Sequence, residues 1–318
     1  MLNVHPPHPK GEAAPHPGVI WIDMVDPSPD ETRLVTELTG VALPTREELA
    51  SLEPSSRMSF DDDRLRVAAP VVADADTDHP SLSHMGLVLT PKLLISVRFE
   101  SLKMFEVAAR KYATAAPTSS VVVFADLMEA YVARLADLLE AARARLDEIS
   151  HQVFRKSAAS PRNALRSSET MRDKLQFLGR MGERTSLIRD SLLGVDRVID
   201  FSLEAAKDWF EPVLAERIAA ARADIEALNQ FEEHLLGKVQ FLLDAVLGFI
   251  SIEQNDIFKV LTIASVVGIF PTLVAGWYGM NFANMPEYHW AYGYQFGIGV
   301  IVLSTIAPLL WFKWRGWL

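Results

Sequence analysis

Two long runs without a charged residue, Val260–Trp277 and Trp290–Phe312, constrain this chain more than any other feature. A helix needs roughly 20 predominantly apolar residues to cross the hydrocarbon core of a bilayer, and each run comes close to that length. We therefore expect two membrane-spanning helices joined by a short turn. The expected limits are a first span at 258–278, a loop at 279–289 and a second span at 290–312.

Basic residues mark the outer ends of these two runs. Lys259 precedes the first run, and Lys313 and Arg315 follow the second, whereas the turn between them carries one acidic residue, Glu287, and one histidine. Loops on the cytoplasmic side of a membrane are enriched in lysine and arginine. The pattern predicts that both termini are cytoplasmic, with a C-terminal segment at 313–318, and that the turn faces outward.

Composition narrows what the rest of the chain can do. The 318 residues carry a net charge of -10 at pH 7 and include no cysteine. The acidic balance argues against a partner that is a nucleic acid. Without thiolates, a metal must be bound by oxygen or imidazole, which favours hard cations. The sequence contains no catalytic constellation and no nucleotide-binding loop, so we do not expect an enzyme or an organic cofactor.

The N-terminal part divides into a tail and a domain. Residues 1–18 contain several prolines and histidines but no apolar run, so we expect a flexible tail without a secretory signal. Residues 19–120 alternate like strands and carry two helix-capping signatures, Ser28 with Glu31 and Thr45 with Glu48. We expect a small cytoplasmic α/β domain with a mixed sheet. Its predicted strands are 19–24, 65–72, 85–89 and 93–99.

From residue 121 onward the apolar spacing changes to that of helices. Two helices, 124–154 and 161–199, are expected to pair within 121–211. A third begins near Pro212, and because no stop interrupts it before Pro271, a stalk helix (212–257) should continue into the first span. Its apolar stripe predicts a coiled-coil seam, whose partners, in the same chain or in other copies, stay open. The seam comprises Leu228, Phe231, Leu235, Val239, Leu242, Val246 and Phe249.

The turn between the two runs is the candidate site. Two membrane helices cannot enclose a water-filled path, so ion conduction requires a ring of copies, with the first span lining the path. A ring of Asn281 carboxamides suits Mg²⁺, because this ion dehydrates reluctantly and an amide oxygen accepts hydrogen bonds from its bound waters. Glu287 would raise the local cation concentration. Apolar constrictions are expected lower in the span, at Phe258, Leu261 and Ile269.

The residues of the same turn are similar to those of a known protein family. Tyr278–Glu287 reads Tyr-Gly-Met-Asn-Phe-x-x-Met-Pro-Glu, and residues 255–261 and 272–275 extend the similarity. On these residues the chain resembles the CorA family of divalent-cation transporters, the two-transmembrane class with a Gly-Met-Asn motif. The resemblance is close over the last fifth of the chain. Upstream, only the short segments Trp21–Asp23 and Leu94–Arg98 are similar to family members.

The resemblance implies a fold and an activity. The implied fold is an α+β cytoplasmic domain followed by a long stalk helix and two transmembrane helices, assembled with other copies of itself into a funnel-shaped homopentamer. The implied activity is uptake of Mg²⁺, with Co²⁺ and Ni²⁺ also accepted, under control of intracellular Mg²⁺. The implied location is the plasma membrane, which in a Gram-negative cell is the inner membrane.

The resemblance also implies roles for individual positions. The selectivity loop is Gly279, Met280 and Asn281, with Asn281 holding the hydrated ion. The polar residues that face the pore are Asp244, Asn255 and Thr272, and the hydrophobic gate is Phe258 and Leu261. Asp224 lies near the stalk position of a regulatory metal site, although direct alignment places an alanine there.

Two alternatives remain open at this stage. A related branch of the same class transports zinc, and its layout is comparable. The Met285-Pro286-Glu287 segment and the lack of cysteine favour Mg²⁺ over Zn²⁺. The other alternative is a non-conducting scaffold, in which the two spans only anchor a coiled-coil body to the lipid bilayer.

Overall fold

The computed structural model describes residues 1–7, 18–50, 58–77, 79–156, 164–280 and 285–317. These residues form two compact units. The first comprises Met1–Arg155 with Leu175–Leu243, and the second comprises Lys156–Lys174 with Asp244–Leu318.

A six-stranded sheet forms the N-terminal part of the first unit. Its strand order is β1-β2-β6-β5-β4-β3, and every neighbouring pair is antiparallel except β2 and β6, which run parallel. The predicted mixed sheet is therefore confirmed. The strands are β1 (Leu2–His5), β2 (Trp21–Val25), β3 (Met58–Asp61), β4 (Arg64–Ala73), β5 (Ser81–Leu89) and β6 (Leu94–Arg98).

Strand β1 corrects the prediction of a flexible tail over residues 1–18. Leu2 pairs with Met24 and Val4 pairs with Ile22, so the start of the chain adds an antiparallel edge strand to the sheet. Leu2 and Val4 are each only 7% exposed. Burial of these two apolar side chains, together with the ladder hydrogen bonds, favours an ordered strand. The rest of the predicted tail, 8–17, lies outside the described residues.

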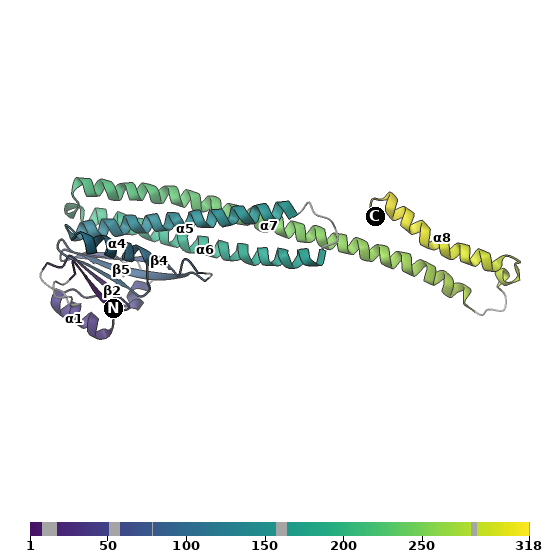
Figure 1. The fold of residues 1–318 in the computed structure, drawn as a ribbon, viewed down its shortest axis with the longest axis horizontal. Helices are drawn as coiled ribbons and strands as arrows, with labels where there is room; N and C mark the ends of the chain where they lie inside the picture. Colours follow the sequence, from purple (N-terminus) through teal and green to yellow (C-terminus); the bar gives the residue numbers. More distant parts are fainter. Residues whose placement is uncertain (8–17, 51–57, 78, 157–163, 281–284, 318) are drawn as a thin grey trace. The chain divides into compact units, whose positions relative to one another are not determined.

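Both faces of the sheet are covered by helices (Figure 1). Alternation along β2 sends Ile22 and Met24 into a core with Val35 of α1 (Pro29–Thr39). Trp21 points to the other face, where its ring lies 6.2 Å from that of Phe105 on α4 (Lys103–Thr114). Helix α4 and strand β3 were not predicted. The period-two pattern of a strand thus decides which helix each residue meets.

Both capping predictions are confirmed. The Ser28 hydroxyl accepts from the Glu31 amide at 3.2 Å, and the Glu31 carboxylate accepts from the Ser28 amide at 2.9 Å. Thr45 and Glu48 make the same reciprocal pair at the start of α2 (Arg46–Ala50). Each pair satisfies two amides that a helix start otherwise leaves without a partner.

Three long helices run side by side in the first unit (Figure 1). They are α5 (Ser120–Lys156), α6 (Ala164–Ala205) and the first part of α7 (Pro212–Tyr278), with a short 3₁₀ helix, η2 (Lys207–Trp209), before α7. Helix α5 is tied to the sheet by the Tyr131 hydroxyl, which donates to the Pro70 carbonyl at 2.8 Å. The predicted continuity of stalk and first span is confirmed, because α7 is one helix of 67 residues.

Three of the seven predicted seam residues of α7, Leu228, Phe231 and Phe249, are only half-buried, and Phe231 also lies out of register. Leu235, Val239 and Leu242 are buried as predicted, but Phe231 is half-buried and the neighbouring Glu232 is only 1% exposed. The buried positions of α7 recur at alternating intervals of four and three residues. This spacing places position 232, and not position 231, in the buried seam. The apolar side chain of Phe231 misled the prediction, because hydropathy alone assigned it to the core.

The second unit contains the two candidate membrane spans. They are the apolar part of α7 and α8 (Gly293–Trp314), separated by a 3₁₀ helix, η3 (Pro286–His289). Both helices are long and apolar enough to cross a bilayer, and the most apolar window of each is 0% and 6% buried, respectively. Core helices of a soluble protein would be mostly covered. The exposure of these apolar windows therefore fits contact with lipid or with other helices.

Candidate functional site

The predicted pore positions share one side of α7. Asp244, Asn255, Phe258, Leu261, Ile269 and Thr272 all lie on this uninterrupted helix and are all exposed. At about 100° per residue, these six positions fall within about 120° of the helix circumference. The buried residues Leu235, Val239 and Leu242 lie on another side, centred roughly 130° away. The candidate face is therefore one that the chain's own core leaves uncovered.

Two threonine hydroxyl groups of the span are satisfied within the helix. Thr262 donates to the Phe258 carbonyl at 2.8 Å, and Thr272 donates to the Gly268 carbonyl at 2.7 Å. A hydroxyl bonded in this way can face lipid, a neighbouring helix or water without leaving an unsatisfied donor. Its oxygen keeps a lone pair that can accept from a water molecule.

Gly279 ends α7 at the candidate entrance. Its amide donates to the Ala275 carbonyl at 2.9 Å, and the Met280 amide donates to the Trp277 carbonyl at 3.2 Å. A Cβ atom at position 279 would lie 3.2 Å from the Ala275 oxygen, which is tighter than most such contacts. Glycine thus allows the chain to turn closely over the last carbonyls of the helix.

The structure describes only part of the rest of the candidate entrance. Met280 is 46% exposed. Asn281 lies outside the described residues, so its predicted role stays a prediction. The backbone of Glu287 belongs to η3, but its side chain is outside the described set. After η3, Trp290 packs edge-on against Phe296 of α8 with 5.6 Å between ring centroids.

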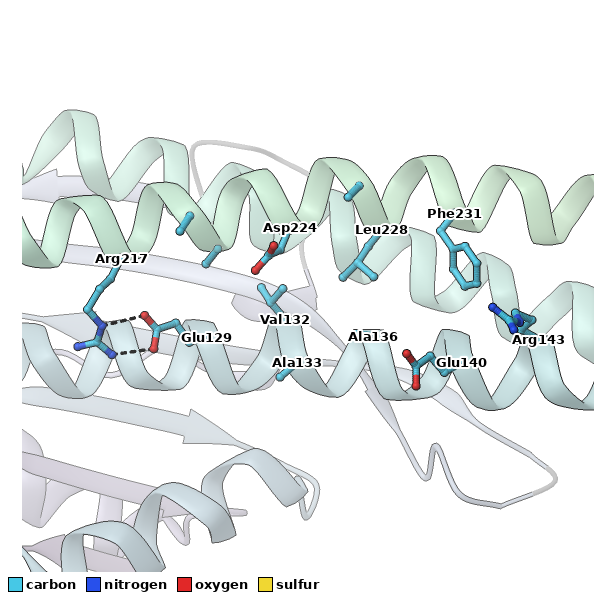
Figure 2. Close-up of a pocket in the computed structure, with 13 residues that line it drawn as sticks. Glu129, Val132, Ala133, Ala136, Glu140, Arg143, Arg217, Asp224, Leu228 and Phe231 are labelled. Carbon is cyan, nitrogen blue, oxygen red and sulfur yellow. Dashed lines mark hydrogen bonds and ion pairs between the residues drawn. The ribbon is translucent and has the colours of Figure 1, made fainter.

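A groove of about 630 Å³ runs between α5 and α7 in the first unit (Figure 2). Alanines line much of its floor, together with Val132, Leu228 and Phe231, and charged side chains stand along its edges. Asp224, the predicted regulatory residue, is exposed in this groove. Among the described residues no group of three or more potential metal ligands occurs. One copy of the chain therefore offers Asp224 without a surrounding ligand cage.

A charged cluster that sequence reasoning missed lies at one end of the groove. Arg217 donates to both carboxylate oxygens of Glu129, at 3.0 and 2.7 Å, as Figure 2 shows. It also donates to Asp126 at 2.8 Å, and Asp126 accepts from Lys111 and Tyr112 as well. Burial raises the pKa of Asp126, but these hydrogen bonds outweigh it and hold the pKa below its ordinary value. The cluster joins α4, α5 and α7.

A second buried cluster lies inside the sheet, on two segments that resemble the family. The Arg98 guanidinium donates to both oxygens of Asp23, at 3.2 and 2.9 Å, and the pair is almost fully buried. Ser96 donates to Asp23 at 2.8 Å and accepts from Trp21 at 3.0 Å. These partners are about 75 residues apart in sequence, so only the parallel pairing of β2 with β6 brings them together. These hydrogen bonds join β2 to β6 inside the domain.

The fold and the placement of these residues define a class of protein. An α/β domain with a helical bundle leads through one continuous helix into a first candidate span, and a second candidate span follows. The profile of the family described as CorA-like Mg2+ transporter protein matches residues 17–314. The chain belongs to this family. Its members are transporters, which confirms that the chain is not an enzyme.

Individual relatives agree with this assignment. The magnesium transport protein CorA of Escherichia coli strain K12 is 32% identical over 313 residues, which cover 96% of this chain and 94% of that protein. The protein of the same name from Pectobacterium atrosepticum is 31% identical over 302 residues, 94% of this chain and 92% of that one. The structure of the CorA magnesium transporter from Methanocaldococcus jannaschii superposes with a TM-score of 0.75 at 18% identity, over 94% of this chain and 91% of that one. The predicted cytoplasmic-type α/β domain, long helix and C-terminal helix of membrane-spanning character are thereby confirmed, and the funnel-shaped oligomer stays a prediction.

Proposed function

We propose that this chain is a divalent-cation uptake channel that admits hydrated Mg²⁺, and also Co²⁺ and Ni²⁺, through a ring of identical copies. The observation that supports it most is the shared, uncovered face of α7 that bears Asp244, Asn255 and Thr272. If that face turns toward a symmetry axis, the copies enclose a path lined by oxygen atoms. A homopentamer in the plasma membrane, with both termini in the cytoplasm, is the assembly proposed here.

Selection takes place at the outer entrance. Asn281 carboxamides hold the ion through its bound waters, because an amide oxygen accepts hydrogen bonds without the strong binding of a carboxylate. Gly279 and Met280 complete the loop and set the close turn that follows α7. Glu287 attracts cations toward the entrance. The membrane potential then drives the ion inward, at about 2.3 kcal/mol per charge per 100 mV and so twice that for a dication.

The closed state is apolar. Phe258, Leu261 and Ile269 are 63%, 60% and 55% exposed in one copy, so neighbouring copies can bring them together. Such a constriction excludes water from a narrow path and blocks a hydrated ion. Intracellular Mg²⁺ stabilises this state in the proposal. Asp224 would supply one carboxylate to a regulatory ion, with the remaining ligands contributed by an adjacent copy.

Ion flux into liposomes that contain the purified full-length chain tests the proposal. Mg²⁺, Co²⁺ and Ni²⁺ should enter, and raised internal Mg²⁺ should reduce the rate. Entry of Zn²⁺ in preference to Mg²⁺ would support the zinc alternative. A chain that passes none of these ions would be the scaffold.

The Asn281→Ala variant tests the entrance itself. Loss of the carboxamide should abolish Mg²⁺ flux while the oligomer, measured by size-exclusion chromatography with light scattering, stays assembled. Asn284→Ala removes an equal carboxamide three residues further along the same loop and should leave flux near the wild-type rate. Equal flux in wild type and Asn281→Ala would refute the selection mechanism.

A further inference from the structure

The turn that ends α8 is a fixed structure. Gly316 has a φ of +72°, in the left-handed region that favours glycine. Its amide donates to the Lys313 carbonyl at 3.1 Å, and the Trp317 amide donates to the Phe312 carbonyl at 3.0 Å. These two bonds form a Schellman motif. The Trp317 ring also stacks on Phe312 with 5.4 Å between centroids, which adds the apolar contact that accompanies the motif.

This turn gathers three tryptophans at the end of the second span. Trp311, Trp314 and Trp317 are 49%, 83% and 41% exposed, whereas Phe312 between them is 2% exposed. Tryptophan prefers the boundary between hydrocarbon and headgroups, because its ring is apolar and its N–H needs a polar partner. If α8 crosses the bilayer, the turn lies at that boundary.

Two cations on the same turn have no acidic partner among residues 1–7, 18–50, 58–77, 79–156, 164–280 and 285–317. Lys313 and Arg315 are both exposed, and within the part of the chain that the structure describes neither forms an ion pair. The Arg315 guanidinium lies 5.7 Å over the Trp311 ring, which orients it without neutralising it. By contrast, Lys259 near the first span is paired with Asp256 at 2.8 Å.

We propose that this turn binds the headgroup of an anionic phospholipid. The phosphate accepts hydrogen bonds from Arg315 and Lys313, since guanidinium and ammonium groups bind phosphate oxygens strongly. The three tryptophans contact the lipid just below the phosphate. The proposal rests on α8 crossing the membrane, as in the proposed function, but it does not depend on ion flux.

Lipid binding to the purified full-length chain in detergent tests this directly. Native mass spectrometry with added phosphatidylglycerol gives a dissociation constant for the wild type. The same measurement with phosphatidylcholine, which has no net charge, serves as the comparison. The double variant Lys313→Gln/Arg315→Gln should bind phosphatidylglycerol about 25-fold more weakly, from roughly fivefold per cation near an anionic surface. Its phosphatidylcholine binding should weaken much less, because the choline cation of that lipid offsets the charge of its phosphate. Lys259→Gln, which removes a paired cation, should leave both constants unchanged.

Two further experiments distinguish a structured lipid-binding site from attraction by charge alone. Gly316→Val keeps both cations and all three tryptophans but strains the turn, so it should weaken phosphatidylglycerol binding as well. Soluble glycerol 3-phosphate should not displace the lipid, because it lacks the acyl region that the tryptophans contact. The proposal is wrong if the double variant binds phosphatidylglycerol as tightly as the wild type, or if glycerol 3-phosphate displaces the lipid.

Discussion

Glu232 places a carboxyl group inside the helical bundle. Its side chain is 1% exposed, and within the described residues one carboxylate oxygen has no hydrogen-bond partner. Burial raises the pKa of Glu232 above 4.5, and the nearby Arg189 only partly opposes this, while Glu233 and Asp190 add to it. The charged form is thus disfavoured in the folded bundle. A group whose pKa is higher when folded than when unfolded destabilises the fold as it ionises.

We expect Glu232→Gln to change the pH dependence of stability. At pH values below about 4.5 the carboxyl is protonated in both states, so the variant should gain little. As pH rises toward the folded pKa the wild type loses stability that the variant keeps, at about 1.4 kcal/mol for each unit of pKa shift. Thermal unfolding of the purified chain from pH 5 to pH 8 measures the difference, which should widen with pH.

Glu233→Gln provides the matched control for this experiment. It removes the same charge from the adjacent residue, which is exposed. Because the Glu233 charge contributes to the raised pKa of Glu232, this variant should reduce the pH-dependent loss of stability only in part, whereas Glu232→Gln should remove it. A difference between Glu232→Gln and the wild type that does not change with pH would contradict a disfavoured buried charge.

At the scale of elements, Gly194 sets how closely α6 approaches β4. A Cβ atom at position 194 would lie 2.2 Å from Cδ and 2.3 Å from Cγ of Pro70. The proline ring is rigid, so the helix or the strand must move to admit a methyl group. Glycine at this position therefore allows α6 to pack directly against β4.

We expect Gly194→Ala to destabilise the chain by about 1 to 2 kcal/mol. Overpacking costs about 1 to 3 kcal/mol, which exceeds the gain of up to about 1 kcal/mol from replacing a helical glycine by alanine. Gly179→Ala in the same helix meets open space and should be neutral or stabilising. Thermal unfolding of both variants checks this. A stabilised Gly194→Ala variant would show that the two elements are free to separate.

Local signals in the sequence predicted where helices and strands lie better than they predicted which residues of different elements contact one another. Capping pairs three residues apart located α1 and α2, and the lack of any stop from Pro212 to Pro271 predicted one continuous α7. Helix α4 was missed because its N-cap residue, Leu102, makes no side-chain capping bond, and strand β3 was missed because its four residues include no buried side chain. The ion pair of Arg217 with Glu129 joins residues 88 apart, and no local pattern indicates it. Of the site, sequence could name the positions on α7 and most of the helix side that the core buries, but not the charged cluster at the end of the groove.

For the whole molecule, a water-filled ion path requires several copies of the chain. Two spans per copy cannot enclose water, and the exposed apolar residues of α7 and α8 need either lipid or other helices as neighbours. The alanine-lined groove between α5 and α7 offers a further exposed surface in the first unit. The proposed ring places one face of α7 toward a shared path and leaves the opposite face away from it.

Accessibility of single cysteines on α7 reports which face of the helix lines the path, and the chain has no native cysteine that would interfere. Thr272→Cys lies on the candidate face, and Val267→Cys lies about 180° from the centre of that face. In liposomes, a small, water-soluble, charged thiol reagent should block Mg²⁺ flux through the Thr272→Cys protein and leave the Val267→Cys protein unaffected. Block of the Val267→Cys protein, with the Thr272→Cys protein unaffected, would contradict the proposed path.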